Sequence, residues 1–105
     1  MGLSPQLELW AEASVINTGV VSFASNSGRF LSVLRSAAGV VDVTLQPDQG
    51  ADFSDRAVLI SPANAGGTSV LAVLDLTASS DTVYRVRSFS DAGAALDTSF
   101  SILIV

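Results

Sequence analysis

The chain has 105 residues and a mass of 10.8 kDa, which is the size of one domain. It is 49 % hydrophobic and only 14 % charged, whereas a typical soluble domain has about 25 % charged residues. The sequence contains no His, Cys or Lys, so the commonest ligands of zinc, haem and iron–sulfur clusters are missing, as are most general bases and covalent nucleophiles. These absences favour a protein that is not an enzyme and binds no cofactor.

The charge balance excludes further classes of partner. A net charge of −5 and a pI near 4.2 argue against binding to nucleic acid or to an anionic membrane. The first ten residues have no basic stretch ahead of an apolar run, and no apolar run approaches the ~18 residues of a membrane span. We therefore expect a soluble protein without a secretion signal.

Short runs rich in Val, Ile, Leu, Phe and Thr predict an all-β domain. They are separated by clusters of Gly, Asn, Asp, Ser and Pro at the spacing of 8 to 12 residues that is typical of a sandwich or barrel. We expect seven or eight antiparallel strands, at residues 7–15, 20–24, 29–35, 40–45, 56–61, 68–77, 83–89 and 94–105. The run at 68–77 is expected to be the longest strand. Pro47 ends the strand at 40–45 because proline cannot donate to a β-ladder.

Two of these strands are apolar on both faces. Within Thr68–Thr77 the positions of both parities carry aliphatic residues, and the last four residues of the chain do the same. An antiparallel sheet with one side in water should alternate, so something covers the second face. Either a second copy of the chain covers it, or both strands lie centrally under a long loop; no loop is long or apolar enough to favour the second explanation. The candidate interface residues are Val70, Leu71, Val73, Leu74, Leu103 and Val105.

Three aspartates in or next to predicted strands have two interpretations. They are outward-facing residues, or they pair with arginines across strands or subunits. The two arginines of the Arg85-Val86-Arg87 run must point to the same face. The aspartates are Asp42, Asp75 and Asp97, and their candidate partners are Arg35, Arg85 and Arg87.

A second group of aspartates, Asp48, Asp52 and Asp55, lies in the loop from Pro47 to Asp55. Clustered carboxylates can bind Ca²⁺. However, the spacing is not that of an EF-hand, and Asp also favours loops by capping its own backbone. We therefore expect a solvated turn and no metal site.

The single Trp and the single Tyr have different expected roles. Trp10 shares the polar face of its strand with Glu8 and Glu12, so it is either a docking residue or packs under the N-terminal segment. Tyr84 shares its parity with Val86 and is expected in the core. Trp10, together with Arg85 and Arg87, is a candidate for docking to a partner.

Catalytic motifs are absent from the sequence. A Ser nucleophile needs a base, and without His or Lys only a carboxylate could serve. Glu8 and Glu12 lie on one face of a predicted strand. We expect this face to be exposed to solvent, and we do not expect the two residues to be the catalytic carboxylate pair of a glycosidase. The Gly66-Gly67 pair lacks the Lys and the helix that follow a phosphate-binding loop.

The back half of the chain resembles the closing hairpin of small β-sandwich domains at the ends of bacteriophage tail fibres and related virion proteins. In that family a strand of the form x-V-R-T-F precedes a Gly-containing turn, an Asp and a closing strand of the form F-x-V-x-V. The front half is similar in the order of its strands, with Val41 at the family's aromatic position and Leu45 in place of its usual Phe. The matching segments are Val83–Phe89, Ser90–Gly93, Leu96-Asp97 and Ser99–Val105 in the back half, and Gly28–Arg35, Gly39–Leu45 and Phe53–Val58 in the front half.

The resemblance covers residues 19–105 and implies a jelly-roll-like β-sandwich that forms a homotrimer on the surface of a virion. Residues 1–18 are expected to supply the first strand and a segment that docks to a capsid or fibre protein. Because only about eighteen residues precede the matching region, we expect a capsid decoration or cement protein, or a short spike or fibre component, rather than a whole fibre. The alternative is a module at a fibre tip that binds a receptor or carbohydrate through the loops Pro47 to Asp55 and Pro62 to Gly67.

Overall fold

The structure is a computed structural model, and it describes residues 9–46, 57–63, 70–77, 79–80 and 82–105. Within these residues it contains eight strands and no helix, as the sequence predicts. The strands are β1 (Ala11–Asn17), β2 (Val21–Asn26), β3 (Phe30–Ala37), β4 (Val40–Leu45), β5 (Val58–Pro62), β6 (Val70–Leu74), β7 (Val83–Ser90) and β8 (Phe100–Ile104).

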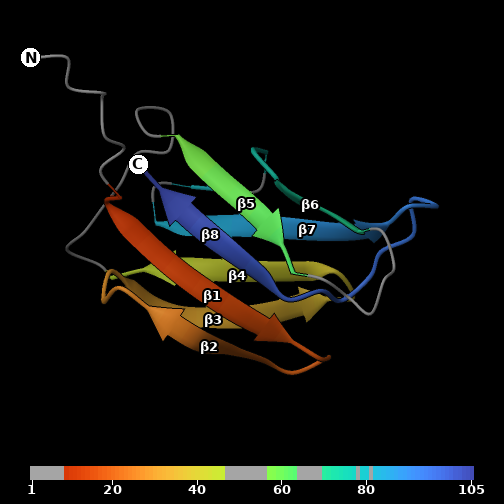
Figure 1. Cartoon of the computed structure of the whole chain (residues 1–105), viewed down its shortest axis with the longest axis horizontal. Coiled ribbons are helices and arrows are strands. Elements are labelled where there is room, and N and C mark those ends of the chain that lie inside the picture. Colours follow the sequence, from red (N-terminus) through yellow and green to blue (C-terminus); the bar gives the residue numbers. More distant parts are fainter. Residues whose placement is uncertain (1–8, 47–56, 64–69, 78, 81) are drawn as a thin grey trace, which may run out of the picture.

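The strands form two antiparallel four-stranded sheets that pack as a β-sandwich (Figure 1). Sheet A has the order β2-β1-β8-β5, and sheet B has the order β3-β4-β7-β6. In Figure 1 the strands of sheet A run obliquely across those of sheet B. The first strand and the last strand are therefore neighbours in the middle of sheet A, and β4 and β7 occupy the corresponding place in sheet B.

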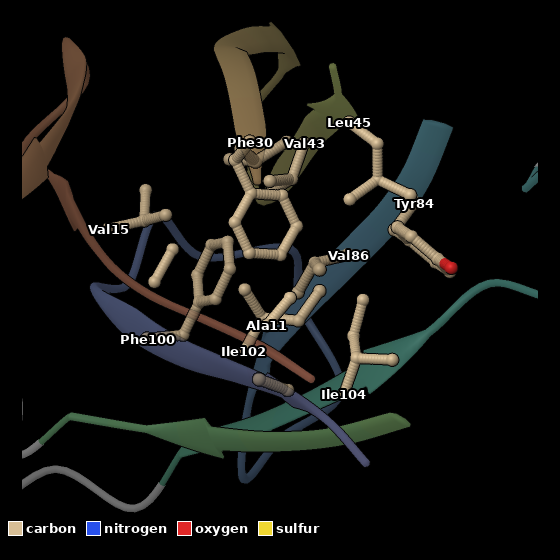
Figure 2. Packing of buried hydrophobic residues seen from close by; sticks show 13 residues of the cluster. Ala11, Val15, Phe30, Val43, Leu45, Tyr84, Val86, Phe100, Ile102 and Ile104 are labelled. Carbon is tan, nitrogen blue, oxygen red and sulfur yellow. The ribbon is translucent and has the colours of Figure 1, made fainter. Parts of the chain in front are cut away.

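The core lies between the sheets and follows the period of two that a strand imposes. Alternate residues of β1, β4, β7 and β8 are fully buried, while the residues between them face outward. Figure 2 shows these side chains meeting from both sheets, with the Tyr84 hydroxyl pointing away from the cluster centre. Tyr84 is fully buried, which confirms its predicted place in the core. The largest fully buried side chains are Tyr84, Phe30, Phe100, Leu45, Ile102, Ile104, Val15, Val41, Val43 and Val86.

Several strand boundaries differ from the prediction, and β1, for example, begins at Ala11 rather than at residue 7. Two of these differences have a structural explanation, and the first is at the end of β6. The strand expected over Thr68–Thr77 ends at Leu74, and its first two residues lie outside the described part of the chain. Within the described residues β6 has five residues, fewer than the eight of β3 and of β7. Oδ1 of Asp75 accepts hydrogen bonds from the Thr77 backbone N–H at 3.1 Å and from the Thr77 hydroxyl at 2.8 Å. These bonds turn the chain, as Asp side chains commonly do.

The second difference is at the closing strand, which was expected to start near Ala94. In the structure β8 begins at Phe100, and a loop occupies residues 91–99. Gly93 adopts a positive φ of 86°, and the Leu96 N–H donates to the Ser88 carbonyl at 3.1 Å. The loop is therefore folded back along β7 before the chain crosses to sheet A.

The two-residue turn between β3 and β4 packs unusually close to this loop. Gly39 has a φ of +69°, and a Cβ at this position would lie 2.6 Å from the Ser88 carbonyl oxygen and 2.9 Å from the Leu96 nitrogen. Both neighbours are backbone atoms, so no side chain can rotate away to make room. The Gly39 carbonyl also accepts a hydrogen bond from the Ser88 N–H at 2.8 Å. Only glycine satisfies both the conformation and the space at this position.

We predict that Gly39→Ala destabilises the protein far more than Gly93→Ala. Gly93 also has a positive φ, but a Cβ there would meet no atom within 4 Å. The left-handed conformation alone costs about 1–2 kcal/mol for a residue with a Cβ. Gly39→Ala adds the displacement of backbone and is expected to lower the free energy of unfolding by at least about 3 kcal/mol. Urea denaturation of the two variants measures the difference, and equal losses would contradict the close packing.

Candidate functional site

The outer face of sheet B carries two ion pairs side by side. Arg85 in β7 lies directly opposite Asp42 in β4 and binds it with two hydrogen bonds, from Nε to Oδ1 at 2.7 Å and from Nη2 to Oδ2 at 2.9 Å. Two residues along β7, Nε of Arg87 donates to Oδ2 of Asp75 at 2.5 Å. The two arginines point to the same face, as their spacing predicts, and they pair within one chain. The hydrogen bonds and charge of Asp42 raise the pKa of Arg85 above its usual value.

A third ion pair forms part of a cluster at one end of the sandwich, which we call the Asp97 clasp. It consists of Asp97, Arg35, Gly39 and Asn17. The Asp97 carboxylate accepts from Nε of Arg35 at 3.0 and 3.1 Å, from Nη2 of Arg35 at 2.9 Å and from the Gly39 N–H at 2.8 Å. It also accepts from the Asn17 side-chain amide at 3.3 Å. One carboxylate thus binds β3 and the β3–β4 turn of sheet B, and the end of β1 in sheet A.

The buried residue Asn17 makes three hydrogen bonds at this end of the sandwich. Its N–H donates to the Ser99 hydroxyl at 2.9 Å, and its side-chain oxygen accepts from the Gly19 N–H at 3.0 Å. Its side-chain nitrogen reaches Asp97. Because unpaired buried polar groups are costly, these bonds fix the position of Asn17 and therefore of the end of β1.

The hydrogen bonds of the clasp hold Asp97 in its ionised form. They lower its pKa from 3.8 to about 2, and the largest contribution is the hydrogen bond from Arg35, followed by the one from the Gly39 N–H. Partial burial opposes this shift but does not outweigh it. Hydrogen bonding to Asp97 also raises the pKa of Arg35.

The outer face of sheet A has a different chemistry. Glu12 is the one ionisable residue in the four described strands of this sheet. A row of serines crosses all four strands, and the hydroxyls of its two central members, Ser14 and Ser101, are 3.1 Å apart. The next row pairs Leu59 of β5 with Leu103 of β8. The face is therefore hydroxylic and aliphatic, with little charge.

The structure divides the predicted interface residues into three groups. Val70 and Leu74 of β6 point inward and are half-buried, and Leu74 packs against the core. Leu71 and Val73 point outward on sheet B and are 57 % and 38 % exposed. The third group, Leu103 and Val105, is half-buried on the sheet A side. Because β6 is an edge strand and β8 an inner strand, the predicted residues do not form one continuous patch.

Trp10, the predicted docking residue, is half-buried just before β1. It packs against the core cluster, and its ring carries the guanidinium of Arg29, whose Cζ lies 4.3 Å from the ring centroid. This distance is that of a cation–π contact. Trp10 thus has a packing role between the start of β1 and the β2–β3 turn. The clasp contacts the other end of β1, at Asn17.

Several predicted features lie outside the described residues. They include the aspartates Asp48, Asp52 and Asp55, the residue Glu8, the Gly66-Gly67 pair and most of the two loops considered for carbohydrate binding. Among the residues that are described, no group of three or more acidic side chains is arranged to hold a metal ion. The described part of the chain likewise has no helix that is long and apolar enough to cross a membrane.

Sequence reasoning identified all three ion-pair aspartates and their arginine partners, Arg35 included, but not the clasp members Asn17 and Gly39. Asn17 lies in an Asn-Thr-Gly sequence, which is ordinary turn chemistry and gives no sign of a contact with Asp97, eighty residues away. Gly39 was predicted only as a turn residue. Gly39 is the only glycine in the turn Ser36-Ala37-Ala38-Gly39, and a residue with a positive φ is usually a glycine. This is the sequence signal that could have indicated a special role for Gly39.

Comparison of the chain with protein-family models, curated proteins and solved structures finds no match.

We predict that the stabilising effect of Asp97 is lost in acid. An unfolded Asp has a pKa of about 3.9, whereas that of folded Asp97 is about 2. A lowered folded-state pKa stabilises the protein fully above the unfolded value, and this contribution disappears as the pH falls through the folded value. The difference in free energy of unfolding between wild type and Asp97→Asn should therefore shrink from about pH 5 to about pH 2.

The matched control is Ser32→Ala in β3, which removes no ionisable group from an exposed position. Its difference from wild type should stay constant over the same pH range. Urea denaturation at each pH measures both differences. A wild-type to Asp97→Asn difference that does not change with pH would refute the ionised clasp.

Proposed function

We propose that this protein is a structural component of a bacteriophage virion. It acts as a homotrimer on the particle surface, where it decorates or cements the capsid or forms part of a short spike or fibre. The observation that carries the proposal is the presence of exposed aliphatic side chains on the outer faces of both sheets of a lightly charged sandwich. The exposed residues are Ile16 and Leu59 in sheet A, and Leu31, Leu34, Leu71 and Val73 in sheet B.

The distribution of charge supports self-association. Four of the five charged residues in the described strands form intrachain ion pairs, which leaves little unbalanced charge on either face. Bringing two such faces together removes aliphatic surface from water at roughly 25 cal/mol per Å², and the charges of sheet B enter the contact already paired. Glu12 is the one charged residue on the described strands of sheet A. A surface of this kind favours contact with another protein surface.

The position of the aliphatic residues supports a ring of copies. The aliphatic patches lie on opposite faces of the sandwich and differ in composition, because sheet A offers serines and leucines and sheet B offers leucines between ion pairs. A contact between two unlike faces is head-to-tail, and head-to-tail contacts that close produce a cyclic oligomer. A trimer is the cyclic oligomer that the resemblance to virion domains implies.

Assignment to a virion rests on the resemblance of β7, the following loop and β8 to the closing hairpin of tail-fibre domains. The Asp of that pattern corresponds to Asp97, which anchors the clasp. A passive structural role also agrees with a chain that lacks His, Cys and Lys. Within the proposal, the half-buried Leu103 contributes to the face between copies, and Arg85 and Arg87 lie on the face available to a docking partner.

We expect light scattering to give a species of three times 10.8 kDa. Leu103→Lys should abolish it, because a charge on the aliphatic face of sheet A would be buried between copies. The substituted side chain lies opposite Glu12, so the single chain should still fold. Thr18→Lys, in the exposed β1–β2 turn, is the matched control and should retain the three-copy species.

A wild-type chain that is monomeric at every concentration would contradict the proposed self-association. The location is tested separately by electron microscopy of the source particle with this chain labelled. Label on the particle surface supports the virion role, and particles without label overturn it.

A further inference from the structure

The four edge strands of the sandwich differ in how they are protected against pairing with another strand. Edge strands expose unpaired backbone groups, and natural proteins block them with bulges, prolines or charges. In this protein β2 carries a bulge opposite Ser14 and Val15, and β3 is irregular in two places and carries Arg35. The third edge strand, β5, ends in Pro62, which has no N–H to donate.

The fourth edge strand, β6, has none of these devices. Its five residues, Val-Leu-Ala-Val-Leu, pair with β7 in a regular register without a bulge. They include no charge and no proline, and Leu71 is 57 % exposed. An exposed, regular, apolar edge strand is a template for the addition of a further strand.

The register with β7 shows which backbone groups of β6 point to the free edge. The Asp75 N–H donates to the Arg85 carbonyl at 2.8 Å, so this pair is hydrogen-bonded. Hydrogen-bonded pairs recur at every second residue of an antiparallel ladder, so Leu71 and Val73 also bond to β7. The N–H and C=O groups of the residues between them therefore point away from β7. These residues are Val70, Ala72 and Leu74.

We propose that β6 is a self-pairing edge, on which β6 of a second copy adds antiparallel about a two-fold axis at Ala72. In this register Ala72 lies opposite the same residue of the second copy, and Val70 lies opposite Leu74. All three outward-pointing N–H groups of each copy then find a carbonyl, because these pairs are the hydrogen-bonded ones. The two B sheets become one continuous sheet.

The side chains of β6 are complementary in the same register. Leu71 lies beside Val73 of the second copy in a non-hydrogen-bonded pair, where side chains approach most closely. Both residues are exposed in the single chain, so pairing removes aliphatic surface from water. No like charges meet along the strand. Strand addition uses the edge of sheet B and not its face, so it extends the proposed self-association without depending on the trimer.

Two double variants test the register. In L71K/V73E, two-fold pairing places opposite charges beside each other across the new edge, whereas in L71E/V73E it places like charges there. Both variants carry V73E, which lies opposite Arg87 in the chain's own sheet, and both disturb the face of sheet B alike. We expect two-fold association to persist in L71K/V73E and to be lost in L71E/V73E. Equal association of the two variants overturns the proposal.

Hydrogen exchange on the wild-type chain provides a test that needs no variant. The Ala72 and Leu74 amides should exchange at least about tenfold more slowly in concentrated than in dilute protein, because pairing hides them from water. The Leu71 and Val73 amides, already bonded to β7, serve as the internal control. Equal exchange of Ala72 and Leu74 at both concentrations, in a chain that does associate, overturns the proposal, as does a chain that never associates.

These readouts separate the proposed pairing from the proposed trimer. A protein that forms dimers with protected Ala72 and Leu74 amides supports the β6 pairing and contradicts the trimer. A trimer that does not form larger species at any concentration, and whose Ala72 and Leu74 amides stay unprotected, supports the trimer and contradicts the pairing. Trimers that join into larger species while these amides become protected support both.

Discussion

The Asp97 carboxylate is the group through which the two sheets are joined at one end of the sandwich. The hydrophobic core holds the sheets together between their middles, but at this end the chain must bring the β3–β4 turn, the end of β1 and the loop before β8 to one place. Asp97 does this by accepting hydrogen bonds from Arg35, Gly39 and Asn17. The arrangement requires an ionised Asp97 and a residue without a side chain at position 39, because a Cβ there would collide with two backbone atoms. Electrostatics and close packing therefore depend on each other at this end.

The same use of charge shapes the surface. The three arginines on the described strands are each matched by an aspartate of the same chain, so these charges serve the chain's own fold. What remains on the outer faces is hydroxylic and aliphatic. Such faces are poorly suited to a solitary protein and well suited to contacts between copies, which is the basis of the proposed structural role. The proposed pairing of β6 is a second kind of contact, made by backbone hydrogen bonds at the edge of sheet B.

The sequence predicts the features of this fold that depend on neighbouring residues. Alternation along 40–45 and 83–89 gives the right strands and the right buried faces, because side-chain direction in a strand has a period of two. Strand ends were predicted less well. The side chain of Asp75, directly after Leu74, turns the chain where β6 stops, and long-range hydrogen bonds hold the loop before β8 against β7 and the β3–β4 turn. The order of the strands was not predicted. For this reason the apolar faces of 68–77 and 94–105 could not be assigned to an edge strand and an inner strand.

The candidate site shows the same division. The positions of Asp42, Asp75 and Asp97 in or next to strands indicated partners among the arginines. The sequence alone does not distinguish pairing within one chain from pairing between subunits. The complete clasp was beyond prediction because its members come from three separate parts of the chain, around residues 17, 35–39 and 97. Asn17 and Gly39 each have an ordinary explanation as turn residues, and only the three-dimensional arrangement gives them a common partner.

The claim that Asp97 joins the two sheets is tested most directly by amide hydrogen exchange in Asp97→Asn. The Gly39 amide, in sheet B, donates to Asp97, whereas the Asn17 amide, in sheet A, donates to Ser99 and depends on the clasp only through the Asn17 side chain. The account predicts that both amides lose protection together while those of Val43 and Ile102, in the middle of the sheets, keep theirs. Loss of protection at Gly39 with unchanged protection at Asn17 would contradict it.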